Sequence, residues 1–230
     1  MDIRPVDGTL LGYLGTPDSD HLVSLGVRRH FAEGDVLLRQ GDPTDHVLVL
    51  LSGWVRVYSL TQDGQETVIA LRGPGDAVGE LAALHGWDRT ASVQALAPVE
   101  AVQLLRHQFI ECLHHRPTIA VALIKQMSIR LREIESTLLD VTTLDVSRRV
   151  AVYLLRMARQ HGTPNPAGTD LGMPLSQQDI ANRVGASLRG VARAMALLRD
   201  RGIVVTTRRR IVIARPDVLR SFAGNMPRGT

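Results

Sequence analysis

A short run of residues in the first half of the chain combines the groups that a sugar phosphate needs. Gly79-Glu80-Leu81 opens the run and Arg89-Thr90-Ala91 ends it. A glycine lets the backbone approach a ligand closely, and the start of a short helix after it would offer N–H groups to an anion. The Glu80 carboxylate can accept hydrogen bonds from a sugar hydroxyl, while the Arg89 fork and the Thr90 hydroxyl can hold a phosphate. The run predicts a pocket for an enclosed cyclic phosphate.

A second candidate site lies about a hundred residues downstream, where residues 175–181 and 185–193 have the pattern of a helix-turn-helix. Arg189 can pair with guanine O6 and N7, whereas Leu188 can make only apolar contact, for example with a thymine methyl. Arg193 can contact either a base or a phosphate. Six further residues are expected to touch phosphates, which position a protein without specifying a sequence: Ser176, Gln177, Gln178, Arg208, Arg209 and Arg210.

Charge is divided unevenly along the chain. Residues 1–173 carry 16 Lys and Arg against 20 Asp and Glu, whereas residues 174–230 carry 11 against 3. The last quarter therefore has a net charge of +8 beside a remainder of −4. A basic segment that coincides with a helix-turn-helix favours double-stranded DNA as its partner over a merely solvated arginine-rich surface.

Short apolar runs separated by turns occupy residues 28–105. Glycine-rich turns at close spacing are expected near Gly41, Gly64 and Gly73. Six candidate strands lie between the turns, over residues 36–38, 47–51, 55–58, 67–71, 92–96 and 99–104. Many short strands with such turns predict an antiparallel barrel or jelly roll.

The hydrophobic period changes near residue 107. Apolar side chains then recur at alternating intervals of three and four residues, at Ile124, Met127, Leu131, Ile134, Leu138 and Val141. This is a heptad seam on a helix of about 25 residues that begins near Pro117, a residue type favoured in the first helical turn. A helix lying on its own barrel usually shows a wider apolar stripe, so the seam favours a homodimer.

The remaining segments complete the C-terminal part. Residues 141–145 interrupt the seam and are expected to form a hinge, and a second helix runs from about Val150 to His161. Composition indicates a loop over residues 162–168. Residues 203–213, with arginines near their centre, predict a two-stranded wing.

The order of these parts resembles the cyclic-AMP receptor/FNR (CRP/FNR) family of bacterial regulators. The matching motifs span almost the whole chain, and they are specific through their joint order and spacing. They are Phe31, Gly34-Asp35, Gly41-Asp42, Ser52-Gly53, Gly75-Asp76, Gly79-Glu80-Leu81, Arg89-Thr90-Ala91, Leu144-Asp145-Val146, Arg149, Gly185, Ser187, Val191 and Arg193.

The resemblance implies an α+β fold in three parts. A cyclic-nucleotide-binding-like β-barrel (jelly roll) would occupy residues 1–116, a dimerisation helix and hinge residues 117–143, and a winged helix-turn-helix DNA-binding domain residues 144–230. In the first part, Glu80 would bind the ribose 2′-hydroxyl, and Arg89 and Thr90 would hold the cyclic phosphate. A salt bridge between Glu80 and Arg89 in a ligand-free pocket is the alternative for these two residues.

This chain departs from the family pattern at two places. Cyclic-AMP-responsive members contact adenine through two adjacent small hydroxyl residues on the long helix, and those positions hold Ile134 and Glu135 here. Glu135 can accept from guanine N1–H and N2–H₂ or from an adenine amino group, or it can lie on the solvated flank of the seam. Leu188 and Arg189 follow Ser187 where the best-known members present Arg and Glu, so we expect a different half-site.

The expected mechanism couples two sites. A cyclic nucleotide, cAMP or cGMP, would bridge the pocket and the long helix and favour one arrangement of the hinge. That arrangement would set two recognition helices near 34 Å apart, one turn of DNA. The expected partners are a second copy of the chain, a palindromic operator in double-stranded DNA, and RNA polymerase. The alternative is a CRP/FNR-type regulator with a vestigial or altered pocket, which binds DNA constitutively or with another effector.

Several other chemistries are disfavoured. Cys112 is the only cysteine, so one chain can form neither an internal disulfide nor a four-thiolate iron–sulfur cluster. Neither metal ligands nor paired haem ligands stand out, and the absence of any nucleophile–base arrangement predicts a non-enzyme. The N-terminus does not resemble a signal peptide, and every apolar run is shorter than the roughly 18 residues of a membrane span. The cytoplasm is the expected location, with no membrane partner.

Overall fold

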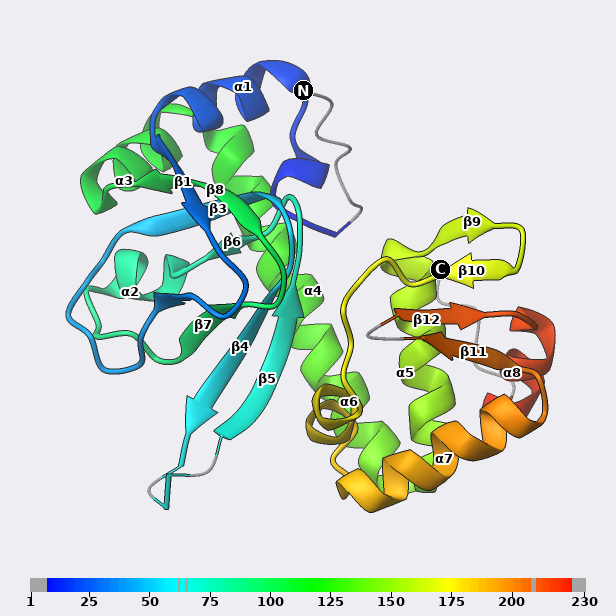
Figure 1. Ribbon diagram of the computed structural model, residues 1–230. Coiled ribbons are helices and arrows are strands. Elements are labelled where there is room, and N and C mark those ends of the chain that lie inside the picture. The colour runs from blue at the N-terminus through cyan, green and yellow to red at the C-terminus, as the bar shows by residue number, and fades with distance from the viewer. Residues whose placement is uncertain (1–7, 62, 65, 208–209, 225–230) are drawn as a thin grey trace. The chain divides into compact units, whose positions relative to one another are not determined.

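The computed structural model describes residues 8–61, 63–64, 66–207 and 210–224. The chain divides into two compact units, Met1–Leu131 and Arg132–Thr230. The division falls inside the long helix α4 (Pro117–Thr143), which Figure 1 shows in green. The boundaries expected at 116/117 and 143/144 stay predictions.

Two antiparallel four-stranded sheets form the first unit, in the strand orders β1-β8-β3-β6 and β2-β7-β4-β5. No strand pairing joins the two sheets among the residues that the structure describes, so the predicted jelly roll is an open one rather than a closed barrel. The strands are β1 (Val27–Phe31), β2 (Val36–Leu38), β3 (Val47–Ser52), β4 (Val55–Leu60), β5 (Glu66–Arg72), β6 (Ala77–Val78), β7 (Ser92–Ala95) and β8 (Val99–Leu104).

Strand β3 shows how this unit builds its core. Its run of five apolar residues does not alternate with polar ones, because both faces of the strand are buried. Leu48 and Leu50 belong to a cluster that also draws on β2, β4, β7 and β8. Val47 and Val49 point to the opposite face, where they join a cluster with residues of the helices, among them Phe109.

The helices of the first unit complete that second cluster. They are η1 (Leu11–Tyr13), α1 (Thr16–Ser24), α2 (Glu80–His85), α3 (Arg106–His115) and the first part of α4. The predicted long helix from Pro117 is confirmed, and Ile119, Ala122 and Leu123 in its first two turns are buried in the core. Cys112 on α3 is buried in the same cluster, and burial raises the pKa of its thiol.

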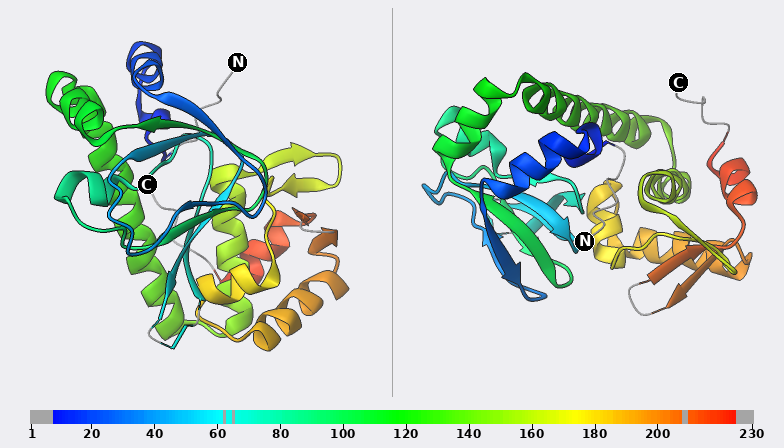
Figure 2. Two further views of the ribbon diagram at one scale, coloured as in Figure 1. Left: turned by 60° about the vertical axis from the view of Figure 1, so that its left-hand side comes forward. Right: turned by 90° about the horizontal axis from the view of Figure 1, so that it is seen from above.

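The second unit is a winged helix-turn-helix (Figure 2). Its sheet has the order β11-β12-β10-β9. Its elements after α4 are α5 (Val146–His161), β9 (Thr163–Asn165), β10 (Gly168–Asp170), α6 (Gln177–Arg183), α7 (Leu188–Asp200), β11 (Val204–Thr207), β12 (Arg210–Ile213) and α8 (Pro216–Ala223).

The loop expected over residues 162–168 is wrong, because β9 and β10 form a hairpin there. Its turn is stabilised by the Asn165 side chain, whose oxygen accepts from the Ala167 N–H at 2.7 Å. Pro164 is tolerated because β9 is an edge strand and β10 pairs on its other side with β12. Pairing with the wing therefore overrides a composition that is typical of a loop.

None of the helices within the described ranges is both long enough and apolar enough to cross a membrane.

Candidate functional site

The predicted pocket residues begin at a sharp turn between β6 and α2. Gly79 has a φ of 83°, in the left-handed region that favours glycine. A Cβ on this residue would lie 2.6 Å from Arg89 Nη1 and 2.9 Å from Leu38 Cδ1. The space that the missing side chain leaves is thus occupied by the Arg89 guanidinium, and both conformation and packing require glycine here.

Arg89 is held in place by neutral oxygens of the protein. The residue is 3% exposed. Its guanidinium donates to the Gly79 carbonyl at 2.9 Å, the His46 carbonyl at 2.7 Å and the Thr44 hydroxyl at 3.0 Å. Within the described residues, no ion pair joins Arg89 to Glu80, so the alternative of a salt bridge between them is not the pairing observed.

The charge of Arg89 therefore lacks a partner anion at contact distance among the residues described. Burial lowers the pKa of the guanidinium, and nearby carboxylates, Asp45 foremost, oppose that shift. An arginine remains charged at neutral pH even so. A buried, oriented cation fixed by neutral acceptors is suited to receive an anion from outside the chain.

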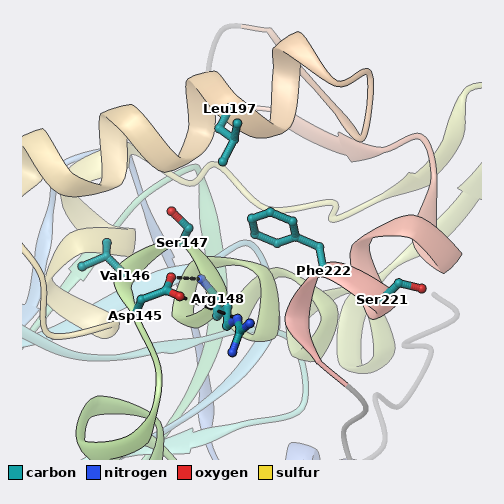
Figure 3. Close-up of a pocket in the computed structure, with 7 residues that line it drawn as sticks. All are labelled: Asp145, Val146, Ser147, Arg148, Leu197, Ser221 and Phe222. Carbon is teal, nitrogen blue, oxygen red and sulfur yellow. Dashed lines mark hydrogen bonds and ion pairs between the residues drawn. The ribbon is translucent and has the colours of Figure 1, made fainter.

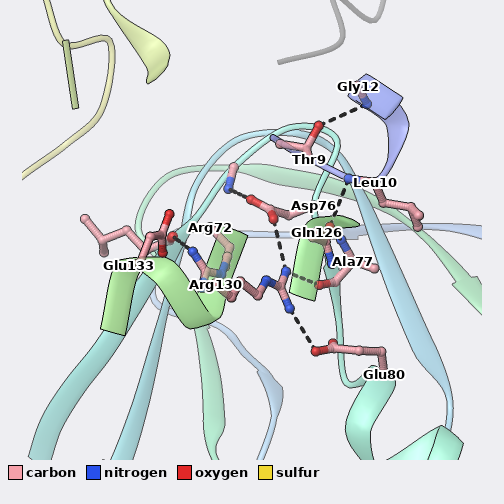
Figure 4. Close-up of polar contacts among 12 residues, drawn as sticks. Thr9, Leu10, Gly12, Arg72, Asp76, Ala77, Glu80, Gln126, Arg130 and Glu133 are labelled. Atoms are coloured by element: carbon pink, nitrogen blue, oxygen red, sulfur yellow. Dashed lines mark hydrogen bonds and ion pairs between the residues drawn. The ribbon is translucent and has the colours of Figure 1, made fainter. Parts of the chain in front are cut away.

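Glu80 is instead paired with Arg130, a residue on α4 that our sequence analysis missed (Figure 4). Arg130 Nη1 donates to Glu80 Oε1 at 2.8 Å, and its Nη2 donates to Asp76 Oδ1 at 3.0 Å and to the Ala77 carbonyl at 2.7 Å. Both carboxylates are buried, so these charges are compensated in a poorly solvated place. The network connects the predicted ribose-binding carboxylate to the long helix.

Gln126, one helical turn before Arg130, fixes the same helix to the pocket wall. Its side chain is fully buried, and Oε1 accepts from the Leu10 and Ala77 N–H groups at 2.9 and 3.2 Å. The spacing of four residues between Gln126 and Arg130 places both on one face of α4. Nothing in the sequence of α4 singles out Arg130, because Ser128, Arg132 and Ser136 repeat the same spacing of polar residues.

The other predicted pocket residues are less enclosed. Thr90 is exposed, Ala91 is half-buried, and Leu81 is 38% exposed on α2. Ile134 and Glu135 are exposed residues of α4 that belong to the second unit. Their expected contact with a nucleotide base stays a prediction.

In the second unit, α7 has two distinct faces. Val191, Ala194, Met195 and Leu198 are buried, while Leu188 is 48% exposed. Arg189 and Arg193, one turn apart, are exposed as well, and neither side chain makes a hydrogen bond or ion pair within the described residues. The helix thus presents a stripe of uncommitted cationic groups next to one apolar group.

Serine caps define where the two helices of the motif begin. Ser187 accepts from the Gly190 N–H at 3.1 Å and caps α7. Ser176 caps α6 in a reciprocal arrangement with Asp179. Gln178 bonds to Asn182 at 2.9 Å, and Gln177 is half-buried. The expected phosphate contacts of Ser176, Gln177 and Gln178 stay predictions.

The wing is confirmed as the β11–β12 hairpin. Arg208 and Arg209 lie outside the described residues. Arg210 is exposed, and its guanidinium pairs with the buried carboxylate of Asp170 on the neighbouring strand β10. Asp170 also accepts from the Gly172 N–H at 3.1 Å, so Arg210 is anchored to the sheet.

A cavity of about 730 Å³ lies elsewhere in the second unit (Figure 3). It is lined by Asp145, Val146, Ser147, Arg148, Leu197, Ser221 and Phe222. The Asp145 carboxylate at its edge is engaged, because it caps α5 by accepting from the Arg148 N–H at 3.0 Å. None of the predicted site residues lines this cavity.

The heptad seam is exposed along α4. Ile124, Leu131, Ile134 and Leu138 are 57–65% exposed, Val141 is 41% exposed, and Met127 is half-buried. A row of large apolar side chains in water is unfavourable for a lone chain and typical of a surface that another molecule covers.

Comparison with known proteins identifies both units. Residues 28–116 match the cyclic nucleotide-binding domain, and residues 148–222 match the Crp-like helix-turn-helix domain. The cAMP-activated global transcriptional regulator of Mycobacterium tuberculosis is 33% identical over 172 residues, which cover 75% of this chain and 77% of that protein. The cyclic AMP receptor protein of Thermus thermophilus is 30% identical over 83% of this chain and 85% of its own length.

Solved structures agree with this assignment. A CRP-family transcriptional regulator of Thermus thermophilus has a TM-score of 0.71 at 26% identity, covering 86% of this chain and 97% of its own. A mutant of CooA from Carboxydothermus hydrogenoformans, at 20% identity, supports the fold alone, with a TM-score of 0.76 over 96% of this chain and 99% of that chain. The M. tuberculosis relative is named as a transcriptional regulator, and residues 148–222 match a helix-turn-helix domain, which confirms the prediction of a non-enzyme. With its two matched domains and these relatives, the chain belongs to the CRP/FNR family of DNA-binding transcriptional regulators.

Proposed function

We propose that the chain is a homodimeric regulator whose first unit binds a cyclic nucleotide and whose second unit binds palindromic DNA in response. The observation that carries this proposal is the state of Arg89, a buried cation oriented by three neutral oxygens. A cyclic phosphate would supply the missing negative charge, and the Thr90 hydroxyl next to it in sequence would add a hydrogen bond.

The Glu80 carboxylate can accept a hydrogen bond from the ribose while it remains paired with Arg130. An ionised carboxylate has about four lone-pair positions, and the pairing with Arg130 involves Oε1. The 2′-hydroxyl of a bound nucleotide would donate to the same carboxylate. Since Arg130 lies on α4, occupancy of the pocket would be transmitted to the helix that carries the seam.

The relatives from M. tuberculosis and T. thermophilus are named for cyclic AMP, which makes cAMP the first effector to test. Ile134 and Glu135 replace the usual adenine contacts, and a carboxylate can also accept from the guanine N1–H and N2–H₂ groups. We therefore infer a cyclic-nucleotide effector whose base preference depends on this pair of residues.

Isothermal titration of the purified protein with cAMP and with cGMP tests the proposal. We expect at least one nucleotide to bind, and Arg89→Ala to abolish that binding. Arg39→Ala is the matched control, because Arg39 is exposed in the same unit and its side chain makes no hydrogen bond or ion pair within the described residues. Absence of heat with both nucleotides would overturn cyclic-nucleotide sensing and favour another effector or constitutive DNA binding.

A second copy of the chain is the proposed cover for the seam. Parallel packing of two α4 helices would bury Leu131 and Leu138 as knobs in facing holes. Sedimentation should give a dimer for the wild type and a monomer for Leu138→Glu, whereas Arg132→Glu, beside the seam, should remain dimeric. A monomeric wild type at micromolar concentration would contradict the proposal.

The proposed DNA site is a palindrome, because a two-fold dimer presents two copies of α7 to successive major grooves. Leu188 and Arg189 would specify bases, and RNA polymerase at the promoter is the further partner that family membership suggests. A DNA-binding protein of this kind would act in the cytoplasm.

A further inference from the structure

Within the second unit, the distal part of α4 is fastened to α5 by one arginine. Arg156 Nη2 donates to the Asp140 carboxylate at 2.6 Å and to the Ser136 hydroxyl at 2.5 Å. Both charged side chains are about one fifth exposed, so bulk water and salt screen this pair only in part. The contact spans the short junction Leu144–Asp145 between the two helices.

A second arginine fastens the first helix of the helix-turn-helix to the same part of α4. Arg183, the last residue of α6, donates to the Thr137 hydroxyl at 2.9 Å, and its Nη2 lies 3.8 Å from Glu133 Oε2. Packing adds to this contact at the following turn, where a Cβ on Gly185 would lie 3.1 Å from Val141 Cγ2.

The four α4 residues that receive these contacts share one face. Glu133, Ser136, Thr137 and Asp140 follow one another at intervals of three, one and three residues. The seam residues of the same turns lie one position later, at Ile134, Leu138 and Val141, and are exposed. One face of α4 therefore carries the proposed dimer contact, and the adjacent face contacts α5 and the helix-turn-helix.

The contacts do not cover the residues of α7 that are expected to contact DNA. Leu188, Arg189 and Arg193 are exposed in the arrangement in which both arginines are engaged. Rotation at the junction would separate Arg156 from Asp140 and Arg183 from Thr137. Holding these contacts thus keeps each recognition helix at a fixed place relative to the seam while it can still reach a major groove.

We propose that Glu133, Ser136, Thr137, Asp140, Arg156 and Arg183 form a latch that determines which half-site spacing the dimer accepts. Arg156 and Arg183 are positioning residues, which act through α7 rather than on the bases. The inference rests on the proposed palindrome-binding homodimer. When the latch is closed, the dimer has one distance between its recognition helices. When it is open, the dimer samples several distances and loses binding free energy when DNA selects one of them.

The test uses a palindromic duplex that the wild-type protein selects from a randomised DNA pool, with effector present. Affinity is then measured for that duplex, for versions lengthened or shortened by one and two base pairs between the half-sites, and for a single half-site. For Arg156→Gln we expect a roughly five- to tenfold loss on the selected spacing, the low end of the usual coupling range. The affinity for the duplexes with altered spacing should fall less, and the affinity for the single half-site should stay within about twofold of the wild-type value.

Two further variants separate the latch from a folding defect. Arg159→Gln removes the same charge from an exposed position of the same helix, where the side chain makes no hydrogen bond or ion pair among the described residues, and should behave as wild type. The charge exchange Arg156→Asp with Asp140→Arg should restore the spacing preference that either change alone reduces.

An unchanged spacing preference in Arg156→Gln and Arg183→Gln would overturn the latch. An equal loss of affinity for the single half-site would also overturn it, because that loss would mean that the helix-turn-helix itself is damaged. Failure of the charge exchange to restore the preference would also contradict it. These results differ from a failure of the proposed function, in which the wild type itself would select no palindrome.

Discussion

The two predicted sites of this protein are built in opposite ways. The guanidinium of Arg89 is buried and held by three oxygens of its own unit, whereas those of Arg189 and Arg193 are exposed and uncommitted among the described residues. A small ligand must be enclosed, so its site is preformed and desolvated. A DNA duplex is read from outside, so its site consists of side chains that stand free on a rigid helix. Substitutions should therefore have different consequences in the two places.

Arg89→Ala should have the largest effect, because it removes the buried cation that is proposed to hold the phosphate. We expect the affinity for the cyclic nucleotide to fall about 100-fold or more, as a charge-assisted bidentate contact is worth about 3 kcal/mol. Arg89→Lys should recover little, since a point charge cannot replace the fork. Titration calorimetry measures both, and near-wild-type binding by either variant would place the phosphate elsewhere.

Gly79→Ala should lower the folding stability of the preformed site. The new methyl would meet both an unfavourable φ and the Arg89 guanidinium at 2.6 Å, so we expect a loss of about 2–3 kcal/mol in unfolding free energy. Gly34→Ala is the control, since Gly34 also has a positive φ but nothing within 4 Å. It should cost about 1 kcal/mol. Equal costs in denaturant unfolding would show that the space around Gly79 is not tightly packed.

Arg189→Ala should affect DNA recognition without affecting folding, because the side chain is exposed. Folding stability should be unchanged, while specificity at one base pair of the operator relaxes by about 1–3 kcal/mol. Arg199→Ala near the other end of α7 should leave specificity intact. The measurement is competition between the selected operator and single-base variants, and uniform weakening across all sequences would reassign Arg189 to a phosphate.

Among these changes, Arg210→Ala should have the smallest effect on DNA binding. Asp170 already neutralises part of the charge of Arg210, so we expect a loss of only a few-fold in DNA affinity. The slope of log affinity against log salt should become shallower by about one, with base preference retained. An unchanged slope would show that Arg210 supports the sheet instead of touching DNA.

The same contrast explains how far the sequence could predict this structure. The six predicted strands, α4 and the helix-turn-helix follow from local hydrophobic period and turn residues, and all are present, whereas β1 and β6 were not predicted. The β9–β10 hairpin was missed because Pro164 and Gly168 indicate a loop locally, and only pairing with β12 makes them strands. Local pattern is informative where an element buries a regular face.

Arg130 was missed for a related reason. It is 50 residues from Glu80, and an ion pair between distant residues leaves no periodic signal in the sequence. Arg89 was found because its neighbours in the motif mark it, although its three acceptors at Thr44, Gly79 and His46 could not be predicted. The exposed residues of α7 were easier to identify, since they lie together on one turn-flanked helix.

The coupling that we propose is that occupancy of the Arg89 pocket changes DNA binding by the second unit. Its most direct test is a linkage measurement, in which operator affinity is determined with and without saturating cyclic nucleotide, and nucleotide affinity with and without operator. We expect both affinities to rise by the same factor, as thermodynamic linkage requires, and Arg89→Ala to remove the effect. A nucleotide that binds at the pocket but leaves operator affinity unchanged would contradict this coupling.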